Sequence, residues 1–154
     1  MTFEKAKEYA FLLLKYRLRS EKEIFQRLKR KKYPEGIINK TIDFLKEKKF
    51  LDDNFFARAW TDSRVKRSLG LRRIKQELKL KGIPEEIITS SIQEKAKSYC
   101  EEEVVFEIVK NKLERLKGIE QPVAKRRVYG YLLRRGFSPD IAIETINKLC
   151  KRTS

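Results

Sequence analysis

Positively charged side chains crowd one stretch in the middle of the sequence. Between residues 64 and 81 there are eight bases and a single acid, Glu77. The bases are Arg64, Lys66, Arg67, Arg72, Arg73, Lys75, Lys79 and Lys81. Guanidinium and ammonium groups donate charge-assisted hydrogen bonds to phosphate oxygens, so such a cluster is suited to holding phosphates. These residues therefore form the first candidate binding site.

Two further groups of bases lie later and earlier in the chain. The later group contains no acid and consists of Lys125, Arg126, Arg127, Arg134 and Arg135. The earlier group is the run Lys29, Arg30, Lys31 and Lys32. A solvated helix face would explain any one of these groups. Three of them together favour a groove of phosphate contacts, which would be independent of sequence and sensitive to salt.

Two tyrosines, Tyr129 and Tyr131, lie inside the later group of bases. An aromatic ring beside cations can stack on an exposed base of a single strand. We expect Tyr129 to belong to the protein core. For Tyr131 the sequence leaves both interpretations open, as a core residue or as a stacking platform.

The charge of the whole chain has the same sign. Lys and Arg number 38 against 22 Asp and Glu in 154 residues, a formal net charge of +16. This excess indicates a polyanionic partner, and nucleic acid, single- or double-stranded, is the first candidate. The apolar run over residues 9–14 is too short to span a bilayer, so we expect no membrane insertion. We expect a monomer in a reducing cytosol, with Cys100 and Cys150 as small buried residues.

Residues suited to catalysis are scarce. There is no histidine, which removes His-based acid–base catalysis, catalytic triads and His-containing zinc sites. The six glycines are dispersed and form no phosphate-binding loop. The carboxylate pairs at residues 52–53 and 85–86 stand where helices should begin, which favours caps and first-turn acids. We therefore expect no enzyme, no cofactor and no metal site, and a nuclease is the least favoured alternative.

Helices must position the bases, because apolar residues recur at three and four along nearly the whole chain. The pattern also repeats, at an offset of fifty residues and then of fifty-four. The first copy has Ile24, Leu28, Tyr33, Pro34, Ile37, Ile38 and Ile42, and the second has Ile74, Leu78, Ile83, Pro84, Ile87, Ile88 and Ile92. The third has Val128, Leu132, Phe137, Ser138, Ile141, Ala142 and Ile146. Recurrence at seven positions indicates an internal repeat.

Each repeat has room for three helices. The first helix is expected over residues 3–17, 53–67 and 102–117, and near residue 99 a junction or one bent helix is possible. A left-handed residue should end the middle helix, where Gly82 and Gly136 stand but the first copy has Lys32. We predict an all-α protein of three tandem helix-turn-helix-like repeats, residues 1–50, 51–100 and 101–154, in an elongated, curved arrangement.

The middle helix of the second repeat should have two faces. Arg72, Lys75 and Lys79 recur at three and four, away from Ile74 and Leu78. A helix-turn-helix pattern also suggests a transcription factor. That interpretation is weaker, because the helix after the turn opens with two acids at residues 85–86, which would face phosphates badly.

The central repeat resembles the signature of the bacterial RecX family. There, an LDD-x-x-FA segment precedes a G-x-x-RI-x-x-EL-x-x-KGI helix. The matching residues are Leu51, Asp52, Asp53, Phe56, Ala57, Gly70, Arg73, Ile74, Glu77, Leu78, Lys81, Gly82 and Ile83. Chain length, basic charge and tandem three-helix repeats agree with the same family, so the resemblance extends over essentially the whole chain.

The resemblance implies a regulatory protein. Members of the RecX family bind the RecA recombinase filament on DNA, in its helical groove, and lower its strand-exchange, ATPase and coprotease activities. For this chain, the resemblance implies a RecA filament as partner. We expect Asp52 and Asp53 to cap a helix, and a contact with the recombinase is the secondary interpretation of these two residues. The main alternative is a stand-alone DNA- or RNA-binding protein that binds without sequence preference and has no recombinase target.

Overall fold

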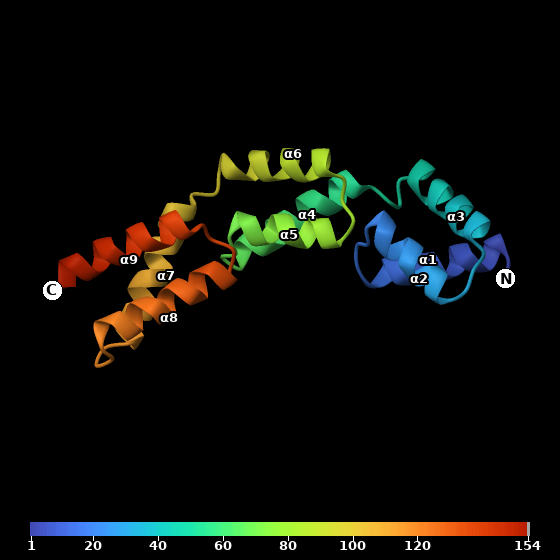
Figure 1. Ribbon diagram of the computed structural model, residues 1–154. Helices are drawn as coiled ribbons and strands as arrows, with labels where there is room; N and C mark the ends of the chain where they lie inside the picture. The colour runs from blue at the N-terminus through green and yellow to red at the C-terminus, as the bar shows by residue number, and fades with distance from the viewer. Residues whose placement is uncertain (154) are drawn as a thin grey trace. The chain divides into compact units, whose positions relative to one another are not determined.

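The structure, a computed structural model, describes residues 1–153 and the side chains of residues 1–151. This part of the chain forms nine α-helices and no strand, which confirms the all-α prediction (Figure 1). The helices are α1 (Phe3–Tyr16), α2 (Glu21–Arg30), α3 (Glu35–Glu47), α4 (Asp53–Lys66), α5 (Leu71–Leu80), α6 (Glu85–Ala96), α7 (Glu101–Arg115), α8 (Gln121–Arg134) and α9 (Pro139–Thr153). None of the helices in the described chain is long and apolar enough to cross a membrane.

The helix boundaries agree closely with the sequence pattern. The three expected first helices correspond to α1, α4 and α7, and their ends differ from expectation by about two residues at most. Residues 97–100 are not helical, so α6 and α7 are separate helices and the alternative of one bent helix is wrong. Pro34 is the N-cap of α3, one residue before the helix begins at Glu35.

Side chains cap the first turns of α2 and α4. Ser20 Oγ accepts a hydrogen bond from the backbone N–H of Glu23, whose carboxylate accepts one from the backbone N–H of Ser20. This reciprocal pair is a capping box at the start of α2. Asp52 Oδ1 accepts from the backbone N–H groups of Asn54 and Phe55, at 2.9 and 3.2 Å, and so caps α4.

All three middle helices, α2, α5 and α8, end in the same turn. The left-handed residues are Lys32 (φ 69°), Gly82 (φ 78°) and Gly136 (φ 96°). After α2, the backbone N–H of Lys32 donates to the carbonyl of Lys29, and that of Tyr33 donates to the carbonyl of Leu28. This pair of bonds is a Schellman motif, and equivalent bonds close α5 and α8. The repeat thus extends to backbone geometry, and Lys32 adopts the conformation for which glycine is preferred.

The described chain forms two compact units, and the first comprises residues 1–60 and 77–91. Within it, α1, α2 and α3 pack against one another. Their apolar stripes form one core of Ala6, Ala10, Leu13, Ile24, Leu28, Ile38, Leu45 and Leu51. Ile24 and Leu28 are fully buried, as their i, i+4 spacing predicts.

The second unit comprises residues 61–76 and the chain from Ile92 onward. Here α7, α8 and α9 pack against one another around a core of Val105, Val109, Val128, Leu132, Phe137, Ala142, Ile146, Leu149 and Cys150. The prediction that both cysteines are buried holds for Cys150 and is wrong for Cys100, which is exposed. Cys100 is the N-cap of α7 and therefore lies off its apolar stripe.

The division into units differs from the division into repeats. Helices α4, α5 and α6 each contribute one part to the first unit and the other part to the second. A unit is a set of residues that pack together, whereas a repeat is a segment whose sequence pattern recurs along the chain. The repeat boundaries at residues 50 and 100, and the elongated, curved arrangement, stay predictions.

Candidate nucleic-acid interface

Helix α5 has the two faces that the sequence predicts. Ile74 and Leu78 are fully buried, whereas Arg72, Lys75 and Lys79 are exposed. The exposed residues recur at three and four, so they project from one side of the helix. This side can meet an anion without disturbing the apolar contacts that hold the helix.

The bases before α5 differ in exposure. Lys66 and Arg67 are exposed at the end of α4 and just after it, and Arg64 is half-buried. Cations in the last turn of a helix interact favourably with the negative end of the helix dipole. These side chains thus have a local stabilising role in addition to any contact with a ligand.

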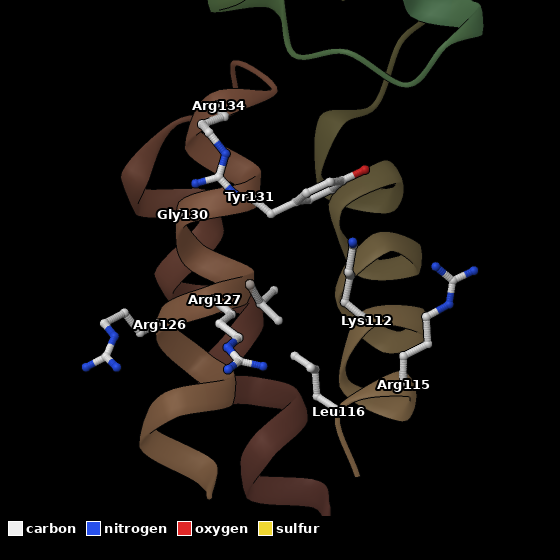
Figure 2. Close-up of a pocket in the computed structure, with 9 residues that line it drawn as sticks. Lys112, Arg115, Leu116, Arg126, Arg127, Gly130, Tyr131 and Arg134 are labelled. Atoms are coloured by element: carbon white, nitrogen blue, oxygen red, sulfur yellow. The ribbon is translucent and has the colours of Figure 1, made fainter. Parts of the chain in front are cut away.

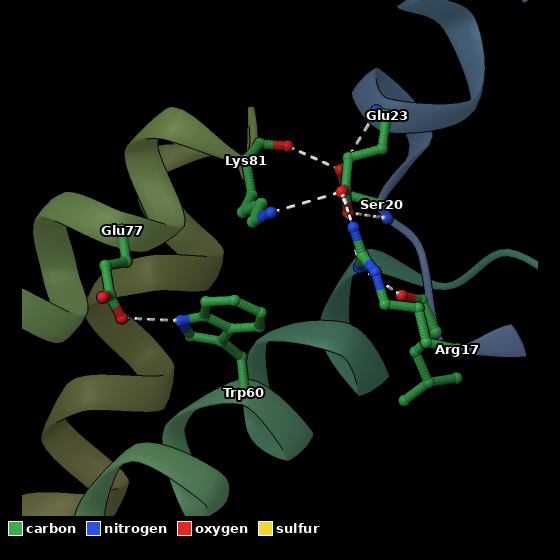
Figure 3. Close-up of polar contacts among 7 residues, drawn as sticks. Arg17, Ser20, Glu23, Trp60, Glu77 and Lys81 are labelled. Atoms are coloured by element: carbon green, nitrogen blue, oxygen red, sulfur yellow. Dashed lines mark hydrogen bonds and ion pairs between the residues drawn. The ribbon is translucent and has the colours of Figure 1, made fainter. Parts of the chain in front are cut away.

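Lys81 is held inside the first unit (Figure 3). Its ammonium lies 3.2 Å from Glu23 Oε2 and 5.0 Å from the centre of the Trp60 ring. Its carbonyl accepts a hydrogen bond of 2.6 Å from Ser20 Oγ. Sequence reasoning grouped Lys81 with the exposed bases, but the structure gives it an acid, a hydroxyl and an aromatic ring as neighbours.

Burial and ion pairing act in opposite directions on Glu23. Burial raises the pKa of this carboxyl, but the hydrogen bond from Arg17, the backbone N–H of Ser20 and the charge of Lys81 together bring it below its usual value. Figure 3 shows Arg17 and Lys81 converging on the same carboxylate. The charge of Lys81 is therefore largely balanced within the protein.

Arg135 and Arg73 join the end of α8 to α5 and to the loop that precedes α5, inside the second unit. Arg135 donates to the carbonyl oxygens of Ser68, at 3.4 Å, and of Arg67. Arg73 donates to the carbonyl of Arg134, at 3.4 Å. These two residues of the predicted site thus have structural contacts, which the sequence pattern did not reveal.

Two glycines make this junction possible. A Cβ atom on Gly70 would lie 2.2 Å from the carbonyl carbon of Gly136, which no side chain tolerates. The backbone N–H of Gly70 donates to the carbonyl of Arg135 at 2.7 Å. The close approach explains why glycine occupies both positions.

Helix α8 also presents accessible basic residues. Arg126, Arg127 and Arg134 are exposed, and Lys125 is half-buried. No carboxylate of the described chain forms an ion pair with the three arginines. Their charges are therefore available to a ligand.

The bases of α8 line a pocket that also contains residues of α7 (Figure 2). We call this space, with a volume of about 490 Å³, the α7–α8 pocket; its lining is Lys112, Arg115, Leu116, Arg126, Arg127, Val128, Gly130, Tyr131 and Arg134. Sequence reasoning missed Lys112 and Arg115, because acids are interspersed with bases along α7. The signal was their spacing with Leu116, at i, i+3 and i+4, which places them on one face.

The two tyrosines have different environments. Tyr129 packs against the apolar core of the second unit, as expected. Tyr131 lines the α7–α8 pocket, with the Lys112 ammonium 3.9 Å and the Arg135 guanidinium 5.4 Å from the centre of its ring. Cations at these distances interact favourably with an aromatic face. The ring therefore holds cations at the pocket.

Fold and surface together define an all-helical protein of three-helix repeats with an accessible cationic face. Three successive segments match families described as the first, second and third three-helix domains of RecX, over residues 6–45, 52–91 and 101–146. These segments cover most of the sequence. The chain therefore belongs to the RecX family.

Known relatives extend the likeness along nearly the whole chain. A regulatory protein RecX from Clostridium beijerinckii is 32% identical over 149 residues, which cover 96% of this chain and 69% of the relative. One from Mycobacterium sp. (strain JLS) is 32% identical over 148 residues, 93% of this chain and 80% of the relative. One from Chlorobium limicola is 31% identical over 145 residues, 94% of this chain and 89% of the relative.

Solved structures share the fold. The crystal structure of RecX from Lactobacillus salivarius has a TM-score of 0.81 at 23% identity and covers 96% of both chains. A crystal structure of a regulatory protein RecX has a TM-score of 0.80 at 22% identity, with 95% of this chain and 71% of that chain covered. At this identity the likeness establishes the helical fold, which agrees with the all-α, three-helix-repeat prediction.

Proposed function

We propose that this chain regulates the RecA recombinase by binding the RecA filament on DNA. Binding mainly lowers the strand-exchange, ATPase and coprotease activities of the filament, and the chain itself carries out no catalysis. The observation that supports this proposal most directly is the succession of three RecX domains over residues 6–146. We further propose that the protein acts as a monomer in the cytoplasm, where a RecA filament would form.

The proposal includes DNA contacts that do not depend on sequence. Exposed basic side chains on α5 and α8 are suited to phosphate oxygens, and contacts to phosphate carry no sequence information directly. The contacts are assigned to the exposed residues Lys66, Arg67, Arg72, Lys75, Lys79, Arg126, Arg127 and Arg134 and to the half-buried Arg64 and Lys125. Arg73 and Arg135 take part mainly by holding the backbone next to these residues, and Lys81 is engaged by Glu23.

A mixing experiment tests the regulatory role. Purified protein is added to preformed RecA filaments on single-stranded DNA, and ATP hydrolysis and strand exchange are followed in time. We expect both rates to fall at protein concentrations below that of RecA, because one bound regulator affects many neighbouring subunits of a filament.

The contrary result is equally clear. If the protein binds bare DNA tightly but leaves both rates unchanged, it has no recombinase target and is a stand-alone nucleic-acid-binding protein. Bare DNA in the same buffer, titrated in parallel, supplies the binding measurement that this comparison needs.

A further inference from the structure

The α7–α8 pocket is built from matching faces of two helices. On α8, Arg127, Tyr131 and Arg134 line it at i, i+4 and i+7. Lys112 of α7 and Leu116, the C-cap of that helix, line it at i and i+4. Figure 2 shows Lys112 and Arg127 directed toward the space between the helices, with Arg115 and Arg126 at its two outer edges.

The charges of the pocket are unbalanced. Five of its lining residues are bases and none is an acid. Within the described chain, no carboxylate pairs with Lys112, Arg115, Arg126, Arg127 or Arg134. Like charges that face one another destabilise a fold, so this arrangement does not contribute to stability. It is suited to a ligand that carries several negative charges close together.

Gly130 also supports the interpretation of this pocket as a site for an anion. Glycine inside a helix is less stable than alanine, and Gly130 lies in the middle of α8. A Cβ atom at this position would lie 3.1 Å from Nη1 of Arg134, closer than an unstrained contact. The bare backbone of Gly130 thus leaves room for the Arg134 guanidinium at the edge of the pocket (Figure 2).

The pocket is suited to binding phosphate and not to stacking of a nucleobase. The Lys112 ammonium already lies 3.9 Å from the centre of the Tyr131 ring. A base stacking on that face would have to displace the ammonium and lose the cation–π interaction. The ring instead holds Lys112 toward the arginines of α8, where an anion can bridge the two helices.

We propose that the α7–α8 pocket is a binding site for two or three adjacent phosphates, bridged between Lys112 of α7 and Arg127 and Arg134 of α8. The volume of about 490 Å³ lies within the range of about 300–1,000 Å³ typical of small-ligand sites. The ligand is a run of phosphates in a nucleic-acid strand or in a free nucleoside triphosphate. The proposal rests on the proposed function, which it deepens by locating phosphate contacts between α7 and α8.

Inorganic triphosphate is the smallest probe of this site. We expect it to bind the full-length wild-type protein in calorimetry, and to shift the amide NMR signals of α7 and α8. An oligothymidylate and an abasic strand of the same length should bind within about threefold of each other, because Lys112 and Arg135 already lie over the Tyr131 ring and a stacking nucleobase would have to displace a cation.

Two double variants isolate the pocket from net charge. Lys112→Gln with Arg127→Gln removes the facing bases, and we expect triphosphate and oligothymidylate to bind at least about tenfold more weakly. Lys110→Gln with Lys148→Gln removes the same charge from exposed positions of α7 and α9 outside the pocket, and should weaken both by less than about threefold.

Gly130→Ala keeps the proposal falsifiable if the double variant folds poorly. Alanine should raise the unfolding midpoint of the protein, because it favours the helix, while displacing the Arg134 guanidinium. We expect triphosphate binding to fall about threefold in this more stable protein. A variant that gains stability and loses binding cannot owe the loss to unfolding.

The competing results are distinct. Equal losses in the pocket and control double variants, or an abasic strand bound more than about tenfold more weakly than oligothymidylate, would overturn the proposal. If triphosphate displaces oligothymidylate the source is a strand, and if ATP binds without displacing it the source is a free nucleotide. Failure of the pocket would leave the RecA assay unaffected, because that assay uses wild-type protein and reads filament activity.

Discussion

At the scale of the residue, Lys32 shows how strongly the turn after the middle helix is imposed by its surroundings. It adopts φ 69° and completes the same hydrogen-bond pair as Gly82 and Gly136 do in the other repeats. A side chain in the left-handed region costs about 1 kcal/mol relative to glycine. The packing of α2 and α3 on either side of the turn must outweigh this cost.

Lys32→Gly should therefore stabilise the protein by about 0.5–1 kcal/mol, since the relief of strain exceeds the added freedom of the unfolded chain. The measurement is the free energy of unfolding in urea. Lys31→Gly is the matched control, because Lys31 has φ −78° and its substitution removes the same charge without any relief of backbone strain. If both variants change stability equally, the left-handed backbone of Lys32 is not strained.

Glu23 is one residue at which pH should act on the first unit. Its pKa is lowered from an ordinary 4.5, since Arg17, Ser20 and Lys81 outweigh the effect of burial. The folded state thus favours the charged form, and this stabilisation is present above the unfolded pKa and is lost as pH falls through the folded pKa. Glu23→Gln should cost about 1–3 kcal/mol at pH 7 and progressively less below pH 4.5.

Denaturant unfolding at a series of pH values measures this effect. Glu86→Gln, an exposed acid in the first turn of α6, is the control and should change stability by a few tenths of a kcal/mol at most. A Glu23→Gln variant whose loss of stability is the same at pH 3 and pH 7 would contradict the ion-pair explanation.

At the scale of the element, α5 joins a buried stripe to a charged face. Ile74 and Leu78 have no exposed surface, and Leu80, two positions after Leu78, is 78% exposed. This contrast follows from the period of the helix, because residues separated by four positions share a face. Apolar character alone would have grouped Leu80 with the core.

Ile74→Ala and Leu78→Ala should each lower the free energy of unfolding by about 2–5 kcal/mol, because each leaves a cavity in a packed interior. Leu80→Ala truncates the same kind of side chain at a solvent-exposed position and should change stability by less than about 0.5 kcal/mol. Chemical denaturation of the three variants gives the comparison directly. Similar values for Leu78→Ala and Leu80→Ala would show that the two faces of α5 are not distinct.

The elements also show where sequence reasoning succeeded. The cap at Asp52 and the left-handed turns located helix ends closely, because both depend on local backbone hydrogen bonds. The exposure of Cys100 was not foreseen. A cysteine is usually buried, but this one ends a loop and precedes α7, so local position prevailed over residue type.

At the scale of the whole molecule, the net charge of +16 should attract polyanionic partners before any specific contact forms. If about six phosphates are neutralised, the logarithm of the binding constant for single strands should fall with the logarithm of salt at a slope near −4. Arg72→Glu with Lys79→Glu should weaken both DNA and filament binding and make this slope shallower by about 1–2, with helicity unchanged.

Titration of labelled single strands at several salt concentrations, with circular dichroism for helicity, measures both effects. Lys110→Glu with Lys148→Glu reverses the same number of charges at exposed positions outside the predicted site. An equal change of slope in this control would show that only net charge matters. Loss of helicity in the Arg72 and Lys79 variant would instead make that face structural.

The sequence by itself determined the class of fold, most helix ends and the buried and charged sides of α5, because these depend on spacing and on hydrogen bonds between neighbours in the chain. Only the tertiary structure decided which side of one helix meets which side of the next. That choice brings Lys112 and Arg115 of α7 to the bases of α8, and it engages Lys81 and Arg135 within the protein. The physical reason is that rotation of a helix about its axis is set by packing of the shared core, which involves residues far apart in the sequence.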